Sequence, residues 1–464
     1  MFVDNNLIKW DLDLIKRYDL SGPRYTSYPT AVQFDPELSA DDLVTKGQTT
    51  ADLNAPLSLY VHIPFCAHVC YYCACNKVIT RNRKKAQPYL DTLYKEMAQL
   101  SQWYSNDRTV TQLHWGGGTP TFISHEQMVE LMAQMRKNFK LLDDDSGDYS
   151  IEIDPREASI ETIKVLREIG FNRISLGLQD IDPKVQEAVN RVQSVEQTSA
   201  ILEEARRLGF RSLNLDLIYG LPYQTLDGFN ATLDKVIEMD PDRLSVFNYA
   251  HLPDRFRPQR HIQEETLPSP ETKLAILEST INKLLKAGYV YIGMDHFAKP
   301  DDELAIAQRT GNLHRNFQGY TTHSECDLVA MGVSAISQIG SVYYQNEHEI
   351  QAYSGAVETS DRAIKRGVAL TQDDIIRRHV ITQLICHFEL EKHPVEKLYG
   401  INFDEYFADA QRELSAFTQD GLIAMDKNKI TVSPAGRLLI RRICMAFDAY
   451  IPKDQSSQRF SRII

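Results

Sequence analysis

Between about Leu57 and Ile339, short segments rich in β-branched and aromatic residues alternate with longer amphipathic segments of helical period. Several long segments end at a glycine, where a helix C-cap is expected. Repeated strand and helix in this order predict a parallel sheet with right-handed crossovers. The predicted strands are 57–63, 110–116, 149–155, 173–179, 212–218 and 243–249, with 289–297 as a seventh. The predicted helices between them are 86–103, 124–139, 159–170, 194–209 and 225–239.

The predicted strands carry polar residues at every second position. Glu152 and Asp154 alternate with isoleucines, and Asn214 and Asp216 alternate with leucines. A parallel strand that is covered by helices on both faces is almost continuously apolar. With a period of two, the leucines and isoleucines face the helices and the polar residues face the other way. About six such strands predict an incomplete, splayed barrel that holds a polar ligand, although an open sheet with one solvated face is the alternative.

Two further regions flank the predicted barrel, which spans residues 51–345. Residues 1–50 form an arm whose Pro and Gly residues, and lack of helical period, predict extended chain that packs on the active site. Residues 346–464 predict a mainly helical C-terminal domain that ends in a short hairpin followed by a helix, a pattern like a winged helix. We favour a packing or lid role for this end over DNA binding.

Charge and hydropathy exclude two classes of partner. The chain has 464 residues and a formal net charge of −12, which opposes binding to nucleic acid. The N-terminus lacks the apolar core of a signal peptide, and no later apolar run is long enough to span a membrane. We therefore expect a cytoplasmic protein without membrane insertion.

Four of the seven cysteines lie in one short stretch, CAHVCYYCAC, from Cys66 to Cys75. A structural zinc site usually takes its ligands from two separated pairs, because one short loop rarely wraps a tetrahedron. The spacing C-x₃-C-x₂-C allows Cys66, Cys70 and Cys73 each to reach one iron of a 4Fe-4S cluster, whereas Cys75 follows too closely to reach the fourth. An iron without a protein ligand is a place for a substrate or cofactor. The other three cysteines are expected to be buried small apolar residues.

This cysteine spacing, directly after the first strand of a βα barrel, resembles the radical S-adenosylmethionine (SAM) superfamily. The resemblance implies an incomplete parallel (βα)6-type barrel of the α/β class. It also implies a 4Fe-4S cluster whose open iron binds SAM, which is cleaved to give a 5′-deoxyadenosyl radical. The glycines of the GGGTP motif at Gly116–Pro120 would let backbone N–H groups approach an anionic or zwitterionic group, although a tight turn is the plainer interpretation.

Longer motifs are similar to the oxygen-independent coproporphyrinogen III oxidases of bacterial heme biosynthesis, over essentially the whole chain. The motifs include PRYTSYPTA, YVHIPFC, CYYCACNK, GGGTPT, EIDPRE, NLDLIYGLP, DRLSVFNYAHLP, LHRNFQGYTT and MGVSAIS. The resemblance implies oxidative decarboxylation of two propionates of coproporphyrinogen III to vinyl groups, which gives protoporphyrinogen IX. It also implies one 4Fe-4S cluster, two SAM molecules, a low-potential electron donor such as a flavodoxin or ferredoxin, and a monomer.

The resemblance also assigns roles to residues, which spacing alone does not separate. The cluster ligands would be Cys66, Cys70 and Cys73. The SAM bound to the cluster would contact Tyr60, Gly117, Glu152 and Ile336. A second SAM would contact Tyr72, Gly118, Thr119, Gln179, Arg191, Asp216 and Ala250. The reaction centre would include Tyr60, His62, Cys75, Phe317 and Gln318.

Two points stay open at this stage. The four propionates of the substrate need cationic or amide anchors, for which the candidates are Arg24, Lys77, Arg81 and Arg315. A related heme chaperone family shares the cluster motif, but it typically has Phe in place of Cys75 and lacks the RYTSYPTA arm. These two features favour the oxidase over a heme chaperone or carrier.

Overall fold

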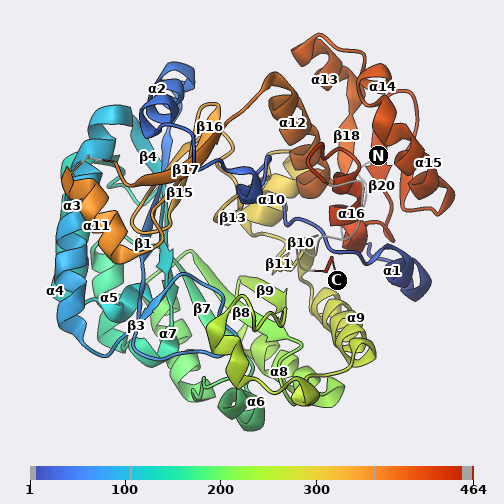
Figure 1. Ribbon diagram of the computed structural model, residues 1–464. Coiled ribbons are helices and arrows are strands. Elements are labelled where there is room, and N and C mark those ends of the chain that lie inside the picture. The colour runs from blue at the N-terminus through green and yellow to red at the C-terminus, as the bar shows by residue number, and fades with distance from the viewer. Residues whose placement is uncertain (1–6, 105–106, 360–361, 452–461, 464) are drawn as a thin grey trace. The chain divides into compact units, whose positions relative to one another are not determined.

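The computed structural model describes residues 7–104, 107–359, 362–451 and 462–463 (Figure 1). Its contacts divide the chain into two compact units. The barrel unit consists of Phe34–Ile276 and Glu325–Ala369. The terminal unit consists of the described parts of Met1–Gln33, Leu277–Ser324 and Leu370–Ile464. The predicted domain boundaries at residues 50 and 345 stay a prediction. Residues 1–6 of the predicted arm, and residues 360–361, 452–461 and 464 of the predicted C-terminal domain, lie outside the described residues.

The barrel unit is built on one curved sheet with the strand order β9-β8-β7-β6-β4-β1-β14-β15-β16-β17 (Figure 1). The order does not return on itself, so the barrel is incomplete, as the sequence predicted. The strands that run parallel are β1 (Leu57–Ile63), β4 (Thr109–Gly117), β6 (Asp148–Ile153), β7 (Arg173–Gln179), β8 (Ser212–Tyr219), β9 (Arg243–Asn248) and β14 (Asp327–Met331). The antiparallel extension is β15 (Ile336–Ile339), β16 (Val342–Asn346) and β17 (Ile364–Ala369), and β5 (Lys140–Leu141) pairs with β4.

Helices follow the strands along their outer side in Figure 1. They are α3 (Ala86–Tyr104), α4 (His125–Asn138), α5 (Ile160–Glu168), α6 (Pro183–Ala188), α7 (Val195–Arg207), α8 (Leu226–Met239) and α11 (Ile350–Thr359). Local sequence sets where several of them begin. Ser124 and Ser159 each form a capping box, in which the serine accepts from the backbone N–H three residues later. These starts agree with the predicted segments within one or two residues.

The strand prediction was wrong at one place. Residues 289–297 do not form a seventh parallel strand but a hairpin of the terminal unit, β10 (Val290–Gly293) with β11 (His296–Ala298). The reason is local, because Gly293 and Met294 have φ of 146° and 56° and turn the chain back. The seventh parallel strand is β14, which pairs with β1.

The rest of the terminal unit is mainly helical. Its helices are α1 (Leu12–Tyr18), α10 (Glu303–Thr310), α12 (Gln372–His387), α13 (Lys392–Tyr399), α14 (Phe403–Tyr406), α15 (Gln411–Gln419) and α16 (Ile440–Met445), and the unit boundary lies within α9 (Pro270–Lys286). A small sheet has the order β18 (Glu389–Glu391), β20 (Lys429–Val432), β19 (Ile423–Met425). The hairpin β12 (His314–Asn316) and β13 (Gly319–Thr321) completes the unit.

The predicted arm is less extended than its sequence indicated. It contains α1 and also α2 (Ala40–Thr50), which belongs to the barrel unit. The side chains of Asp11 and Ser39 cap these two helices by accepting hydrogen bonds from Leu14 and Asp42. The segment between the helices carries the RYTSYPTA motif and is not helical before residue 31. Its packing on the active site stays a prediction.

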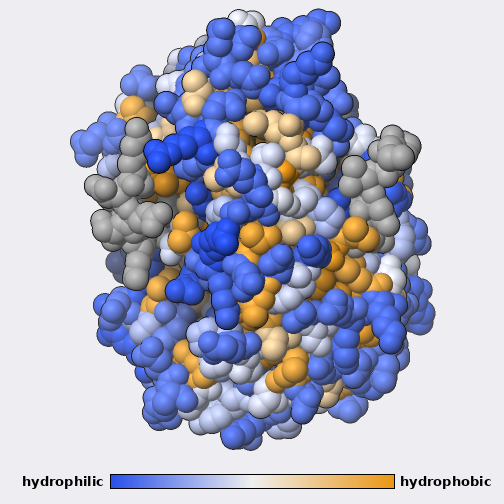
Figure 2. Space-filling model, turned by 90° about the vertical axis from the view of Figure 1, so that its right-hand side faces the viewer, coloured by the Kyte–Doolittle hydropathy of each residue, from blue (hydrophilic) through white to orange (hydrophobic). Residues whose placement is uncertain are grey.

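Polar and charged residues predominate on the face drawn in Figure 2, with hydrophobic residues interspersed among them. No described helix is long and apolar enough to cross a membrane.

A buried carboxylate fastens the end of β14 to helix α3. Glu96 accepts hydrogen bonds from Gly332 N at 2.7 Å, from Asn346 Nδ2 at 2.6 Å and from the Tyr353 hydroxyl at 2.6 Å. The side chains come from three separate segments of the barrel unit. Burial raises the pKa of Glu96 to about 7, although these three hydrogen bonds oppose the rise.

We predict that Glu96 makes the protein less stable as the pH rises. Its folded-state pKa lies above the ordinary value, so its contribution is complete below about pH 4.5 and is lost as the pH passes about 7. Thermal unfolding of the apoprotein, followed by circular dichroism from pH 5 to pH 8, will show a fall in Tm that is smaller in Glu96→Gln. Glu130→Gln, on the exposed face of α4, is the control and will keep the wild-type slope. An equal slope in Glu96→Gln would contradict the assignment.

Candidate functional site

The carboxyl ends of the parallel strands bring the predicted site residues of the barrel unit to one edge. Parallel strands end on the same side of the sheet, so residues far apart in sequence meet there. Tyr60 and His62 lie on β1, Gly117 ends β4, and Glu152 lies near the end of β6. Gln179 ends β7, Asp216 lies on β8, and Ala250 follows β9. The predicted polar face therefore exists, and the polar side chains on it bond to one another.

The cysteine loop is fastened at both ends. Its start and end pair as the short parallel strands β2 (Phe65–Cys66) and β3 (Val78–Ile79). In its middle, Tyr71 N donates to Val189 O at 3.0 Å, and Asn190 Nδ2 donates to Val69 O at 2.7 Å. The loop thus lies against the segment that follows α6.

The three predicted cluster ligands differ from Cys75 in exposure. Cys66 and Cys70 are buried and Cys73 is half-buried, whereas Cys75 is exposed. Burial raises the pKa of Cys66 to about 12. A hydrogen bond from Cys75, together with the charge of Lys77, lowers the pKa of Cys73 to about 6 against the effect of burial. The thiols of one short loop therefore have unequal electrostatic surroundings.

The glycine loop after β4 is pressed against the start of the cysteine loop. A Cβ atom on Gly118 would lie 2.8 Å from the Pro64 carbonyl and 2.9 Å from Cys66 Sγ. Gly117 has φ of 122°, and a Cβ there would lie 2.9 Å from Ile63 O. The N–H groups of Gly117 and Gly118 donate to Glu152 and to Ile63 O. The glycines are thus explained by close backbone approach, because these two N–H groups are already used within the protein.

Two hydrogen bonds and a ring contact link Asn76 to His114 on β4 through Tyr60 and His62 on β1. The Asn76 carbonyl accepts from His62 Nε2 at 3.0 Å, which leaves His62 Nδ1 to accept from the Tyr60 hydroxyl at 3.1 Å. Burial lowers the pKa of His62, which favours the neutral imidazole. The Tyr60 ring stacks on His114, with ring centroids 5.9 Å apart.

Glu152 is oriented by two partners. Its carboxylate lies 3.3 Å from His114 Nε2 and accepts from Gly117 N at 3.1 Å. His114 Nδ1 lies 2.6 Å from the Ser150 hydroxyl. Burial alone would raise the pKa of Glu152, but the His114 and Gly117 contacts outweigh it and lower the pKa. An ionised, oriented carboxylate at this edge can accept hydrogen bonds from an ammonium or hydroxyl group.

Asp216 lies in a second polar layer formed by β7, β8 and β9. It accepts from Asn214 Nδ2 at 2.8 Å and from the Ser175 hydroxyl at 3.1 Å. Burial raises the pKa of Asp216 to about 6, although the bond from Asn214 opposes the rise. The layer is polar and internally bonded, as expected for a sheet face that encloses a polar ligand.

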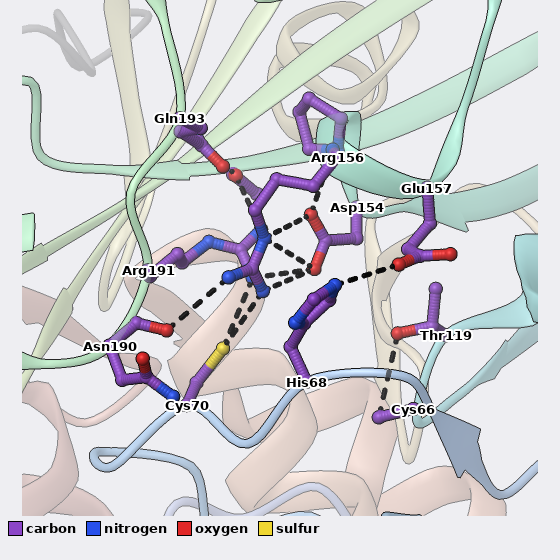
Figure 3. A network of polar contacts seen from close by, with 12 residues as sticks. Cys66, His68, Cys70, Thr119, Asp154, Arg156, Glu157, Asn190, Arg191 and Gln193 are labelled. Atoms are coloured by element: carbon purple, nitrogen blue, oxygen red, sulfur yellow. Dashed lines mark hydrogen bonds and ion pairs between the residues drawn. The ribbon is translucent and has the colours of Figure 1, made fainter. Parts of the chain in front are cut away.

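Two arginines lie against the sulfur of Cys70 (Figure 3). Arg156 Nη2 lies 3.2 Å and Arg191 Nη1 lies 3.4 Å from Cys70 Sγ. Both arginines also donate to Asp154, at 2.7 Å and 3.0 Å. These ion pairs outweigh burial and lower the pKa of Asp154 to about 2. Figure 3 also shows the Thr119 hydroxyl pointing to Cys66, with Oγ1 3.5 Å from Sγ.

Gln259 connects two other predicted site residues. Its Nε2 donates to the Tyr72 carbonyl at 3.0 Å and to the Ala250 carbonyl at 3.2 Å. The side chain is 2% exposed, so the contact is sealed from solvent. Tyr72 in the cysteine loop and Ala250 after β9 are therefore held together.

Three further predicted residues lie on other elements. Ile336 begins β15 of the barrel unit, and Phe317 and Gln318 form the turn of the β12–β13 hairpin in the terminal unit. The roles predicted for these three residues stay predictions.

The sequence reasoning gave no site role to several of the interacting residues, among them His114, Arg156 and Gln259. The period of two on β4 contains the signal for His114, because Gln112 and His114 alternate with Leu113 and Trp115. Arg156 and Gln259 lie in short 3-10 helices after β6 and β9, Pro155–Glu157 and Arg257–His261, which are too short for a periodicity that predicts the direction of a side chain.

The four candidate anchors for propionate differ in their exposure and in the partners that their charged groups already have. Arg24 forms an ion pair with Asp295, and Lys77 Nζ donates to the Cys73 carbonyl at 2.9 Å. Arg81 is exposed. Arg315 is 7% exposed, and its Nε and Nη1 have no hydrogen-bond partner among the described residues. Its guanidinium lies over the Tyr320 ring at 4.7 Å.

Comparison with known proteins gives consistent matches. A family model of the radical SAM superfamily matches residues 60–236, and a model of the HemN C-terminal domain matches residues 370–439. The oxygen-independent coproporphyrinogen III oxidase of Pseudomonas aeruginosa is 58% identical over 98% of this chain and 99% of its own length. Its namesake from Escherichia coli is 51% identical over 98% of this chain and 99% of its own length. A solved structure titled as the coproporphyrinogen III oxidase of Escherichia coli, a radical SAM enzyme, aligns with a TM-score of 0.92 and 50% identity, over 96% of this chain and 100% of that one.

We predict that Gly118→Ala destabilises the barrel unit. The added methyl group would meet Pro64 backbone atoms at 2.8 Å, and overpacking of this kind costs about 1–3 kcal/mol. The matched control is Gly355→Ala in α11, where an added Cβ meets nothing within 4 Å. Because alanine favours helices, that variant will gain about 0.5–1 kcal/mol. Denaturant unfolding of both apoproteins measures the difference, and equal stabilities would refute the contact.

Proposed function

This chain belongs to the family of oxygen-independent coproporphyrinogen III oxidases, which are radical SAM enzymes, and we propose that it converts coproporphyrinogen III to protoporphyrinogen IX in heme biosynthesis. Each of two propionates loses one hydrogen atom to the radical derived from SAM, CO₂, and one electron to an external electron acceptor, and a vinyl group remains. The observation that carries the proposal is the loop Cys66–Cys75, fastened beside Gly118 at the polar edge of the sheet in a chain of this family.

The cysteine loop fits a 4Fe-4S cluster better than a single metal ion. Thiolates on one tetrahedral ion at about 2.3 Å lie about 3.8 Å apart. The sulfur atoms of Cys66, Cys70 and Cys73 do not all lie within 4.8 Å of one another. We propose these three cysteines as the cluster ligands, with Cys75 beside them as a free thiol.

SAM fits the polar edge of the sheet. The Glu152 carboxylate suits the amino or ribose groups of one SAM, and Tyr60, Gly117 and Ile336 complete the proposed contacts. A second SAM needs both donors and acceptors. Arg191 Nε and Gln179 Oε1 are buried without a hydrogen-bond partner among the described residues, which supports this second site. Its other proposed contacts are Tyr72, Gly118, Thr119, Asp216 and Ala250.

The bound cluster and SAM supply a carbon-centred radical that can take hydrogen from an unactivated C–H bond, which no side-chain base does near neutral pH. The chain's own residues bind, orient and exclude water. Glu152 is held by His114 and Gly117, and His62 is fixed in one tautomer by Asn76 and Tyr60. We propose Tyr60, His62 and Cys75 of the barrel unit, and Phe317 and Gln318 of the terminal unit, as residues that contact the substrate or the reacting groups.

The proposal extends to partners and compartment. All seven cysteines, each of them described, are free thiols, which suits a reducing compartment. We propose a monomer in the cytoplasm that receives electrons from a low-potential donor such as a flavodoxin or ferredoxin.

The activity is tested anaerobically with reconstituted protein, SAM, a strong reductant and coproporphyrinogen III. We expect protoporphyrin after oxidation of the products, and 5′-deoxyadenosine, both measured by chromatography with mass detection. Alanine substitution of Cys66, Cys70 or Cys73 will abolish both products, whereas Cys326→Ser, as the control, will retain them. Formation of deoxyadenosine without a decarboxylated product would contradict the proposal that coproporphyrinogen III is the substrate. Heme transfer without SAM consumption would favour a carrier instead.

Arg315 is the proposed anchor for a substrate carboxylate. A buried guanidinium without a carboxylate partner is unfavourable unless a ligand supplies the anion. Asp295 is already paired with Arg24, and Arg315 forms no ion pair among the described residues. A propionate is a planar carboxylate that suits the guanidinium fork.

We predict that Arg315→Met raises the KM for coproporphyrinogen III by about 10-fold to 100-fold, since a charged hydrogen bond contributes about 1.5–3 kcal/mol. SAM binding, measured by calorimetry, will not change. Arg309→Met on α10 is the control, because Arg309 is exposed and, among the described residues, donates to the Pro300 carbonyl alone. An unchanged KM in Arg315→Met would reject the anchor.

A further inference from the structure

Arg156 is a polar contact of Cys70 that the proposed reaction does not use. Its Nη2 lies 3.2 Å from Cys70 Sγ, and Arg191 Nη1 approaches the same sulfur at 3.4 Å (Figure 3). No described arginine hydrogen-bonds to the sulfur of Cys66 or Cys73. The positive charge of the network is therefore directed to one of the three proposed ligands.

The position of Arg156 is fixed by its other contacts. Its Nε and Nη2 donate to the two oxygens of Asp154 at 3.0 Å and 2.7 Å, and its Nη1 donates to the Asn190 carbonyl at 3.3 Å. Asn190 in turn binds the cysteine loop through the Val69 carbonyl at 2.7 Å. The guanidinium is thus held between Asp154 and the loop that carries Cys70.

Arg191 is fixed independently. Its Nη2 donates to the Gly177 carbonyl at 2.7 Å, and its Nη1 donates to Asp154 at 3.0 Å. The side chains of Arg156, Arg191 and Asp154 are 13%, 7% and 10% exposed, so solvent screens their charges only weakly. Two positive charges and one negative charge leave a net positive charge beside Cys70.

Hydrogen bonds and positive charge at a cluster ligand stabilise the more negative, reduced form of an iron–sulfur cluster. We propose that Arg156, together with Arg191 and balanced by Asp154, sets the reduction potential of the cluster through Cys70. Arg156 is a positioning and tuning residue in this proposal, not a catalytic one. The inference rests on the proposed function only in requiring a cluster on Cys66, Cys70 and Cys73.

The test is a redox titration of the reconstituted full-length protein without SAM, monitored by electron paramagnetic resonance, with iron and sulfide content measured in parallel. Arg156→Gln removes one positive charge, and its midpoint potential will shift to a more negative value. Arg156→Lys keeps the charge but loses the planar fork, and it will shift less in the same direction. Asp154→Asn removes the negative charge, and its midpoint potential will shift to a more positive value.

The opposite signs of the two potential shifts distinguish electrostatic tuning from a structural role. A structural role would shift the midpoint potential of both variants in the same direction or would only reduce their cluster content. Arg207→Gln is the control, because Arg207 is exposed and pairs with Glu204 on α7, and it will keep the wild-type potential. Unshifted potentials in Arg156→Gln and Asp154→Asn at full iron content would overturn the inference.

Failure to bind a cluster is interpreted differently for the variants and for the wild-type protein. If Arg156→Gln takes up no cluster, the Asp154→Asn variant tests the proposal alone: a more positive midpoint potential supports the tuning role, and a more negative one contradicts it. Loss of the cluster in both variants would also overturn the tuning role. A wild-type protein that binds no 4Fe-4S cluster would instead refute the proposed function.

Discussion

Close backbone contact between the glycine loop and the cysteine loop is the constraint on which the site depends. The Gly118 Cα lies so near the Pro64 carbonyl and Cys66 Sγ that no side chain fits between them. This contact joins the end of β4 to the end of β1, and the parallel sheet already brings those ends to one edge. The polar residues at the other strand ends can face the cysteine loop only because that loop is held close to the sheet.

The polar face of the sheet follows from the same geometry. Side chains on neighbouring parallel strands are in register, so His114 on β4 meets Ser150 on β6, and Ser175 on β7 meets Asn214 on β8. Each pair satisfies hydrogen bonds that would otherwise be lost on burial. The leucines and isoleucines of the same strands are buried on the opposite face. A sheet with one polar and one apolar face can therefore fold stably and still receive a polar cofactor.

The charge of the side chains differs between the two ends of the edge that the carboxyl ends of the parallel strands form. Near β1 and β6, Glu152 is an ionised acceptor that His114 and a backbone N–H orient. Near β7 and the cysteine loop, Arg156 and Arg191 concentrate positive charge beside Cys70. A zwitterionic ligand such as SAM and an anionic cluster need both kinds of surroundings, so the distribution of charge agrees with the family to which the chain belongs.

The sequence by itself determined the βα order, the position of most helices and strands, and the cluster motif, because these depend on periodicity and spacing within short segments. The period of two also predicted which face of each strand is polar, including Glu152 and Asp216. Sequence reasoning misassigned 289–297, where two residues of positive φ turn a strand-like segment into a hairpin, and it did not identify β14 as the strand beside β1. Only the tertiary structure decided which residues meet across irregular segments. Arg156 lies on Cys70, and Gln259 joins Tyr72 to Ala250, because the loops after β6 and β9 fold back on the cysteine loop, and no local pattern encodes contacts between residues so far apart in the chain.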